Sequence, residues 1–137
     1  MDSDKSLYVN REKVIHLRPE IFNILDHRDS HEMEQYQSDV LRPIAKFQNE
    51  IILRGFDAYL KKYHLKLEGK SIKDQEEIIS KAMKTNKELR CFYQGMLAGL
   101  MTTAEFEFYV SRRAEVHKRM TSLLIQRITS QIIIKVD

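Results

Sequence analysis

The sequence predicts an all-α protein, and three observations support this fold class. Apolar residues recur at intervals of about 100° from Met33 to Tyr59, which is the period of an α-helix. The 137 residues include only 4 glycines and 2 prolines, so few long loops are expected. Three serine or threonine residues precede an acidic residue by three positions, the spacing of a helix N-cap. We therefore expect one domain over residues 1–137, with about five helices in an orthogonal array or an irregular bundle.

The N-terminal segment has the weakest pattern. We expect residues 1–14 to be either flexible or part of a short hairpin, because Ser6–Val9 and Lys13–Leu17 have some strand character. Pro19 suits the first turn of a helix, which predicts a short helix over Pro19–Leu25.

A long helix is expected over about residues 30–64. Its apolar stripe keeps one helical phase on both sides of Pro43, which would be a coincidence if the helix ended there. An interior proline removes a backbone hydrogen bond and bends a helix, so we expect a single helix kinked at Pro43. The stripe consists of Met33, Val40, Leu41, Ile44, Phe47, Ile51, Ile52, Gly55, Ala58 and Tyr59.

Two capping signals follow the loop around Gly69. Ser71 is expected to cap a helix that continues to about Lys84. Thr85 and Glu88 have the spacing of a capping box for the next helix.

That next helix, over about residues 86–101, carries no charge between Cys91 and Met101. A helix that is apolar on all sides is typically buried, so we expect a central helix with the long kinked helix and the last helix packed around it. Gly95 and Gly99 are four positions apart and predict a flat strip for close helix packing, since glycine in a helix costs about 1 kcal/mol otherwise.

The last helix is expected from about Ala104 to Ile128 or beyond. Thr102 and Glu105 form its capping box. Residues 129–137 are expected to fray, and within them the isoleucine-rich stretch Gln131–Val136 predicts either a frayed helix end or a short strand.

Composition excludes several classes of protein. Hydrophobic residues make up 42% and charged residues 31%, a balance typical of globular rather than disordered chains. A glycine-rich phosphate loop is excluded for lack of glycine, and no apolar run approaches the roughly 20 residues of a membrane span. The single cysteine and the acidic N-terminus favour a cytoplasmic location.

Charge is unevenly distributed along the chain, although its net value is only +3. Residues 1–40 hold 5 basic and 9 acidic side chains, whereas residues 41–70 hold 7 basic and 3 acidic ones. Two interpretations remain open. The oppositely charged regions could pack together or share a dimer interface, or the basic regions could bind phosphate.

Arg113 and His117 are the first candidate site, because they lie four apart within the apolar stripe of the last helix. Polar groups that face a core need partners. They are therefore either paired structurally, at a core or a dimer interface, or they form a clamp for phosphate or carboxylate.

A metal site and other cofactors are not expected. His27 and His31 have the spacing of two metal ligands on one helix, but Arg28 stands where a zincin requires glutamate. Cys91 lies in an apolar helix and is expected to be a buried, inert thiol.

The last helix also carries basic residues that could contact the phosphates of a nucleic acid. The alternative is an ordinary solvated helix face. The candidate contacts are Arg112, Arg113, Lys118, Arg119 and Arg127.

One stretch resembles a known domain. In GMLAGLMTTAEFEFYVSRRAEV, residues 95–116, an apolar helix ends in a turn with threonine, and a helix with Glu-Phe and basic residues follows. This pattern is similar to the small C-terminal oligomerisation hairpin called SHOCT. The resemblance implies self-association or an adapter function rather than catalysis.

We expect the protein to be a small cytoplasmic interaction or regulatory module without catalytic activity, which self-associates as a homodimer or binds another protein partner. The alternative is a nucleic-acid-binding regulator that uses its basic C-terminal helix. The two differ in salt dependence, because phosphate binding weakens steeply with salt and an apolar interface does not.

Overall fold

The computed structural model describes residues 10–19 and 32–133, and every regular element in these two ranges is helical. The prediction of an all-α protein is therefore confirmed. None of the described helices is both long and apolar enough to cross a membrane. The elements are a 3₁₀-helix η1 (Arg11–Leu17), α2 (Glu32–Tyr36), a π-helix η3 (Gln37–Leu41), α3 (Arg42–Phe47), α4 (Asn49–Lys62), α5 (Ile72–Thr85), α6 (Lys87–Ala98), α7 (Thr103–Ser111) and α8 (Arg113–Ile132).

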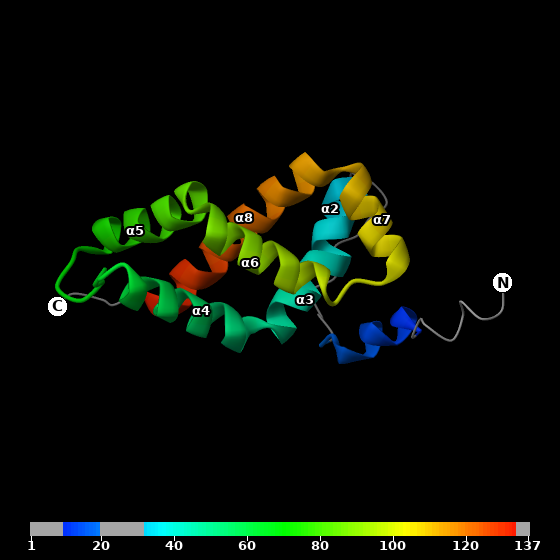
Figure 1. The fold of residues 1–137 in the computed structure, drawn as a ribbon, viewed down its shortest axis with the longest axis horizontal. Helices are drawn as coiled ribbons and strands as arrows, with labels where there is room; N and C mark the ends of the chain where they lie inside the picture. Colours follow the sequence, from blue (N-terminus) through cyan, green and yellow to red (C-terminus); the bar gives the residue numbers. More distant parts are fainter. Residues whose placement is uncertain (1–9, 20–31, 134–137) are drawn as a thin grey trace.

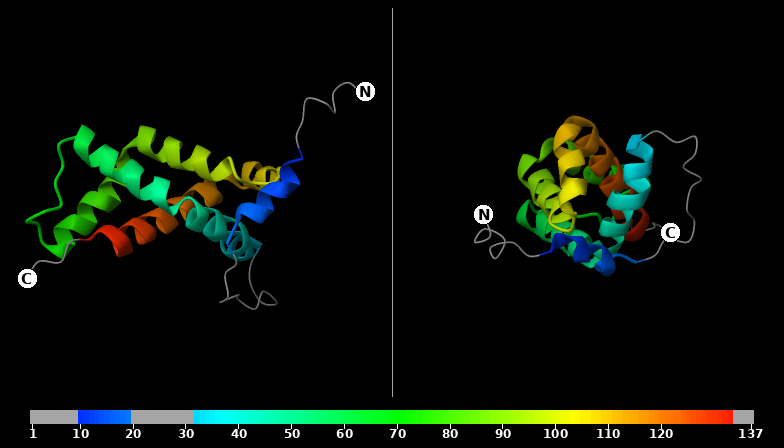
Figure 2. Two further views of the ribbon diagram at one scale, coloured as in Figure 1. Left: turned by 90° about the horizontal axis from the view of Figure 1, so that it is seen from below. Right: turned by 90° about the vertical axis from the view of Figure 1, so that its right-hand side faces the viewer.

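The helices form an elongated bundle (Figures 1 and 2). α4 and α6 lie side by side, and α8 passes behind them (Figure 1). α8 packs on α4, α5, α6 and α7, whereas α6 packs mainly on α5 and α8. α4 and α8 thus both contact α6, but α8 packs on more helices than α6 does, so α6 is not the single centre of the bundle.

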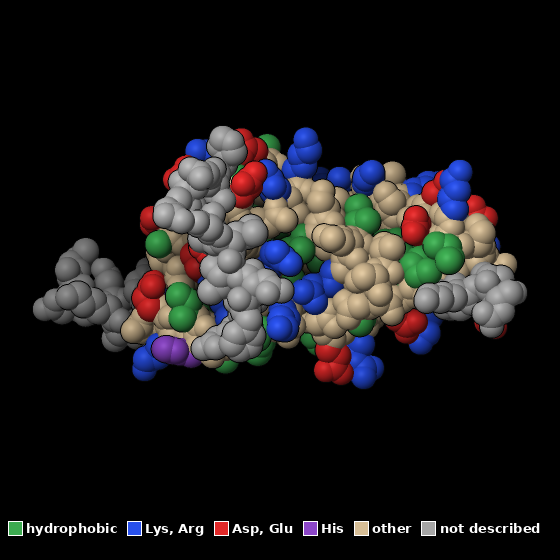
Figure 3. Space-filling model, turned by 180° about the vertical axis from the view of Figure 1, so that it is seen from behind, with side chains coloured by type: hydrophobic (Ala, Val, Ile, Leu, Met, Phe, Trp, Pro, Cys, Tyr) green, Lys and Arg blue, Asp and Glu red, His purple; other side chains and the backbone are tan. Residues whose placement is uncertain are grey.

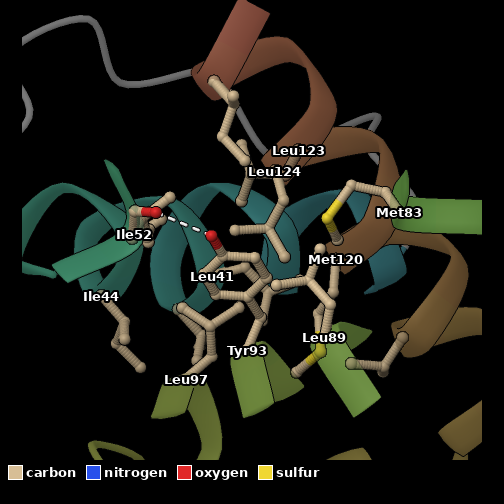
Figure 4. Close-up of a cluster of buried hydrophobic side chains, with 14 of the residues drawn as sticks. Leu41, Ile44, Ile52, Met83, Leu89, Tyr93, Leu97, Met120, Leu123 and Leu124 are labelled. Atoms are coloured by element: carbon tan, nitrogen blue, oxygen red, sulfur yellow. Dashed lines mark hydrogen bonds between the residues drawn. The ribbon is translucent and has the colours of Figure 1, made fainter. Parts of the chain in front are cut away.

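The core lies where η3, α3, α4, α5, α6 and α8 meet (Figure 4). Leu41, Ile44 and Met120 are fully buried there. Tyr93 is also fully buried, and its hydroxyl donates a hydrogen bond to the carbonyl oxygen of Ile52 at 2.7 Å. Burial raises the pKa of Tyr93, so this hydroxyl stays protonated. A polar group at the centre of the core is thus satisfied by the helix opposite it.

The predicted long helix is present from α2 to α4, but its bend has two causes. In the π-helix before Pro43, the Arg42 N–H bonds to the carbonyl of Gln37. This wider turn accommodates a proline ring, which in a regular α-helix would clash with the carbonyl four residues earlier. A second interruption lies at Gln48, whose backbone has φ −88° and ψ 9°. The helix is therefore built of segments rather than kinked once at the proline.

Two of the three predicted caps are confirmed. The Ser71 side chain accepts a hydrogen bond from the Asp74 N–H at 3.1 Å. Thr102 and Glu105 form a complete capping box at the start of α7. The predicted capping box of Thr85 is wrong, because the N-cap of α6 is the next residue, Asn86, whose side chain accepts from the Leu89 N–H. Gly69 has φ +79° in the loop after α4, a conformation that favours glycine.

α6 is amphipathic rather than buried on all sides. It buries Leu89, Tyr93 and Leu97, but Cys91 and Phe92 on its other side are exposed. The absence of charge had suggested a central helix. The structure shows that uncharged residues of this helix need not be buried, since Cys91, Phe92 and Gly95 are all exposed.

The two α6 glycines do not mediate close packing within the described chain. Both are exposed, and a Cβ atom built on Gly95 would have no neighbour within 4 Å. A Cβ on Gly99 would meet only carbonyl oxygens of its own helix. The close approach occurs instead at Gly55 of α4, where a Cβ would lie 3.1 Å from the Phe92 ring. The predicted packing role of Gly95 and Gly99 is therefore corrected in favour of Gly55.

The predicted last helix is divided into α7 and α8. Arg112 leaves the helical region at the junction, with φ −126° and ψ 35°. α8 then continues to Ile132, so residues 129–132 are helical; residues 134–137 lie outside the described ranges. The division changes which residues share a face, because the apolar positions before and after Arg112 belong to different helices.

Two arginines hold residues 10–19 against the turn before α7 and the start of α7. Arg18 forms an ion pair with Glu105, and its side chain is only 7% exposed. Arg11 donates to the carbonyl oxygens of Gly99 and Met101 at 2.8 Å. The segment is the 3₁₀-helix η1, so the expected strand over 13–17 is wrong. The expected strand over 6–9 and nearly all of the expected helix over 19–25 lie outside the described residues.

Candidate functional site

The five basic residues proposed for nucleic-acid binding do not share one face of α8. Arg112 pairs with Glu32 at 3.1 Å, Arg119 donates to Gln37 at 3.0 Å, and these contacts hold α8 against α2 and η3. Arg127 is likewise engaged with α4, where it donates to the amide oxygen of Asn49 at 2.9 Å. Three of the five candidates therefore make contacts within the fold, and a continuous basic face along α8 is not formed.

Basic side chains gather elsewhere. Seen from behind, Lys and Arg side chains lie in the middle of the molecule and along its upper edge, where α5 and α8 run (Figure 3). At this edge a groove of about 710 Å³ opens between α5, α6 and α8. We call it the basic groove; its lining residues are Lys84, Lys87, Arg90, Cys91, Gln94, His117, Lys118, Thr121, Ser122 and Ile125.

Cationic side chains line the basic groove on two sides. Lys84, Lys87 and Arg90 lie on the α5–α6 side, and Lys118 lies on α8. None of the described lining residues is acidic. The three lysines have no ion pair with any carboxylate in the described part of the chain. A concave surface with cations on both sides attracts anions more strongly than the same charges spread over a convex one.

His117 lies in the wall of this groove, where its surroundings favour the neutral imidazole. Burial, the Arg113 charge and the Arg90 charge all lower the pKa of His117. Its Nε2 is 2.5 Å from the hydroxyl of Tyr109, and burial raises the pKa of that hydroxyl. When the protonated Tyr109 donates to Nε2, the hydrogen of the neutral imidazole is on Nδ1.

Arg113 and His117, the two residues of the first candidate site, therefore have different environments. His117 is half-buried and paired with Tyr109, whereas Arg113 is exposed at the first turn of α8. Neither residue lies in the core, where α8 buries Val116 and Met120, and His117 lines the basic groove. Arg113 nevertheless contributes positive charge close to His117.

Cys91 is exposed and lines the basic groove, which corrects the expectation of a buried thiol. It is the only cysteine of the chain. Its accessible position makes it a natural chemical probe for anything that occupies the groove.

A second surface lies on α4 and α6, away from the basic groove. Phe47, Ile51 and Phe92 are 47%, 46% and 48% exposed. Phe47, Ile51, Gly55 and Ala58 are three or four positions apart and share one side of the α3–α4 segment. Gly55 contacts Phe92 and so joins this stripe to α6. We call this surface the apolar face; it consists of Phe47, Ile51, Gly55, Ala58 and Phe92.

A hollow of about 260 Å³ adjoins Phe92 on this face. Tyr59, Tyr63 and Leu89 contribute to its apolar walls. Lys62 and Glu88 lie at its edge, and their side chains are 3.5 Å apart. The face therefore combines a half-exposed aromatic ring, a hollow and one charge of each sign.

Sequence reasoning missed both surfaces. The groove cations Lys84, Lys87 and Arg90 recur every three residues, but this signal crosses the boundary between two helices. For the apolar face, the exposed stripe was assigned to the core.

The histidine pair considered for a metal lies outside the described residues. Among the described residues, no group of three or more histidine, cysteine or acidic side chains could hold a metal ion.

Comparisons with protein-family models, with curated proteins and with solved structures find no match for this chain. The resemblance to the SHOCT hairpin is therefore not supported by a family model. The Thr102–Glu105 capping box accounts for the shared turn, since this motif is common at helix N-termini in unrelated proteins.

Proposed function

We propose that the protein is a small helical interaction module, without catalytic activity, that associates with itself through the apolar face. The observation that carries this proposal is the exposure of nearly half of Phe47, Ile51 and Phe92 on adjoining helices. Single exposed apolar residues are ordinary, but a contiguous group with aromatic side chains is typical of an interaction surface.

The shape of the face favours a second copy of the chain as the occupant. A two-fold interface uses the same patch on both subunits, so the patch must complement itself. The half-exposed Phe92 ring forms part of the wall of the hollow between α4 and α6. Two copies related by a two-fold axis can each insert this ring beside the hollow of the other.

Charge also favours self-association at this face. Lys62 and Glu88 at its edge balance each other, so two copies approach without net repulsion there. In a two-fold arrangement, Lys62 of one copy can face Glu88 of the other. The basic groove lacks this property, because two copies of a purely basic surface repel each other.

The proposal includes a cytoplasmic location. Its support is that the chain has a single cysteine and so cannot form an internal disulfide.

The test compares Phe92→Asp with Val110→Asp by size-exclusion chromatography with light scattering. Both residues are exposed, but Val110 lies on α7, outside the apolar face. Phe92→Asp is expected to give a monomer, because a buried unpaired carboxylate in each subunit opposes association. Val110→Asp is expected to keep the mass of the unmodified protein.

Equal masses for the unmodified protein and both variants would refute association through this face. Circular dichroism of each variant shows whether a lower mass results from unfolding.

A further inference from the structure

The basic groove supports an inference that goes beyond self-association. We propose that the groove between α5, α6 and α8 binds the phosphodiester backbone of a single-stranded nucleic acid, independently of base sequence. The contacts would come mainly from α5 and α6, rather than from the α8 residues that the sequence had suggested.

The cations of the groove are available to a ligand. Lys84, Lys87 and Lys118 are exposed and have no ion pair with a carboxylate in the described part of the chain. Arg90 is partly fixed by a hydrogen bond to the carbonyl of Lys84 at 3.2 Å. Binding of phosphates to such cations releases counterions, which is the main source of affinity in sequence-independent recognition.

Uncharged hydrogen-bonding groups lie between these cations. Gln94 of α6, together with Thr121 and Ser122 of α8, lines the same groove. Hydroxyl and amide groups of this kind donate to phosphate and sugar oxygens and set the position of the strand. Neutral His117 adds a further uncharged group to this lining.

The lining also indicates which part of a nucleic acid is recognised. No described lining residue is an aromatic side chain on which a base could stack, apart from the imidazole of His117. Single-strand-binding proteins commonly combine a basic groove with several stacking rings. A groove with the cations but without those rings favours contact with the backbone, and this predicts little preference among bases.

Two other ligands fit the groove less well. A double helix presents its phosphates on a broad convex surface, whereas a hollow between helices admits one narrow chain. A peptide bound in a groove is normally anchored by apolar side chains in apolar pockets. Ile125 is the only large aliphatic side chain among the described lining residues.

Cys91 allows groove occupancy to be measured directly. It is the only cysteine, it is exposed, and it lines the groove. We therefore propose to follow the rate at which iodoacetamide, an uncharged reagent, alkylates the full chain, with and without a saturating 12-nucleotide oligo-dT. At low salt the oligonucleotide is expected to slow alkylation at least several-fold, and 0.5 M NaCl is expected to abolish this protection.

The binding experiment uses fluorescence anisotropy of labelled oligo-dT and oligo-dA over a series of salt concentrations. The variant Lys87→Gln/Lys118→Gln removes one cation from each side of the groove. The control Lys13→Gln/Lys73→Gln removes the same charge from exposed positions outside it. Loss of two phosphate contacts is expected to weaken binding about tenfold at 0.1 M salt and to reduce the slope of log K against log salt by about 1.4. The control is expected to bind as the unmodified protein does, apart from a small general charge effect.

Several results would overturn the proposal. They are absence of binding at 20 mM salt, equal losses in the two double variants, or oligonucleotide binding that leaves the alkylation rate of Cys91 unchanged. Tighter binding of a 12-base-pair duplex would reject the single strand as the ligand. Protection of Cys91 by poly-glutamate but not by oligo-dT would show that the groove binds an acidic peptide instead. The test of self-association is independent of this inference. Phe92→Asp changes the apolar face but leaves every lining residue of the basic groove in place.

Discussion

The hydroxyl of Tyr109 and the imidazole of His117 form a hydrogen bond that connects α7 to α8 across the break at Arg112. The two rings also meet edge to face, with centroids 5.3 Å apart. This pair fixes the orientation of the imidazole in the wall of the basic groove. The hydrogen bond therefore ties α7 to α8 on either side of the interruption at Arg112.

The titration of His117 is expected to depend on Arg113. The lowered pKa of His117 places its midpoint below the ordinary value of 6.5, first because of burial and then because of the neighbouring cations. Arg113→Gln should raise this pKa towards 6.5, whereas Arg112→Gln should leave it unchanged, since Arg112 is turned to Glu32. Imidazole proton shifts in NMR spectra measure both midpoints, and equal shifts in the two variants would contradict this assignment.

Stability is expected to fall between pH 6.5 and the lower folded pKa of His117. In this window the unfolded chain binds a proton that the folded chain does not, so the free energy of unfolding decreases as the pH falls. Urea denaturation of the unmodified protein and of His117→Gln at pH 7.5 and pH 5.5 isolates this contribution. A pH dependence as large in His117→Gln as in the unmodified protein would assign the effect to other groups.

Glu105→Gln is expected to destabilise the fold by roughly 3 kcal/mol, because it leaves the nearly buried Arg18 without its carboxylate. Burial alone would raise the pKa of Glu105, but hydrogen bonds from Arg18 and Thr102, with the Arg18 charge, lower it overall. The stabilisation from the ionised Glu105 is therefore fully present at a pH above 4.5, the ordinary pKa of glutamate. It is lost as the pH falls through the lower pKa of Glu105 in the folded chain. Urea denaturation from pH 7 to pH 3 should show the two proteins converging. A difference in the free energy of unfolding that stays constant with pH would show that the charge of Glu105 is not the cause of the stabilisation.

Gly95→Ala is expected to stabilise the folded chain by about 0.5–1 kcal/mol. The position is helical and exposed, and the new Cβ would meet nothing within 4 Å. Gly55→Ala should gain less, because its Cβ would lie 3.1 Å from the Phe92 ring, which must then shift. Urea denaturation measures both free energies, and a larger gain at Gly55 would contradict the packing described for α4 and α6.

Tyr93→Phe is expected to lower the free energy of unfolding by about 1 kcal/mol. The change removes the buried hydrogen bond to Ile52 without opening a large cavity. Tyr63→Phe is a matched control, since Tyr63 is exposed and its change should stay within about 0.5 kcal/mol of zero. Similar losses in both variants would indicate that the hydrogen bond of Tyr93 contributes little.

Local signals in the sequence predicted local structure well. The caps at Ser71 and Thr102 follow from side chains three residues apart, and the structure contains both. The signal at Thr85 was misleading because its neighbour Asn86 is at least as good a cap and takes the position. The break at Arg112 has no proline or glycine to mark it, so sequence alone could not locate it.

The candidate sites depend on contacts that sequence periodicity does not contain. Apolar spacing cannot tell whether a stripe faces the core or the solvent, and Phe92 therefore appeared to be a core residue. Arg119 and Arg127 looked free on a helical wheel, yet each hydrogen-bonds a residue about 80 positions earlier in the chain. The basic groove combines three helices, and only their packing brings Lys87 and Lys118 to one hollow.

Sedimentation equilibrium of the unmodified protein at 0.05 M and 0.5 M NaCl tests the central claim most directly. Association through the apolar face predicts a mass twice the monomer value of 16.3 kDa at micromolar concentration, with little change between the two salt concentrations. A mass of 16.3 kDa across the whole concentration range would contradict self-association. A dimer that dissociates at high salt would contradict an apolar interface.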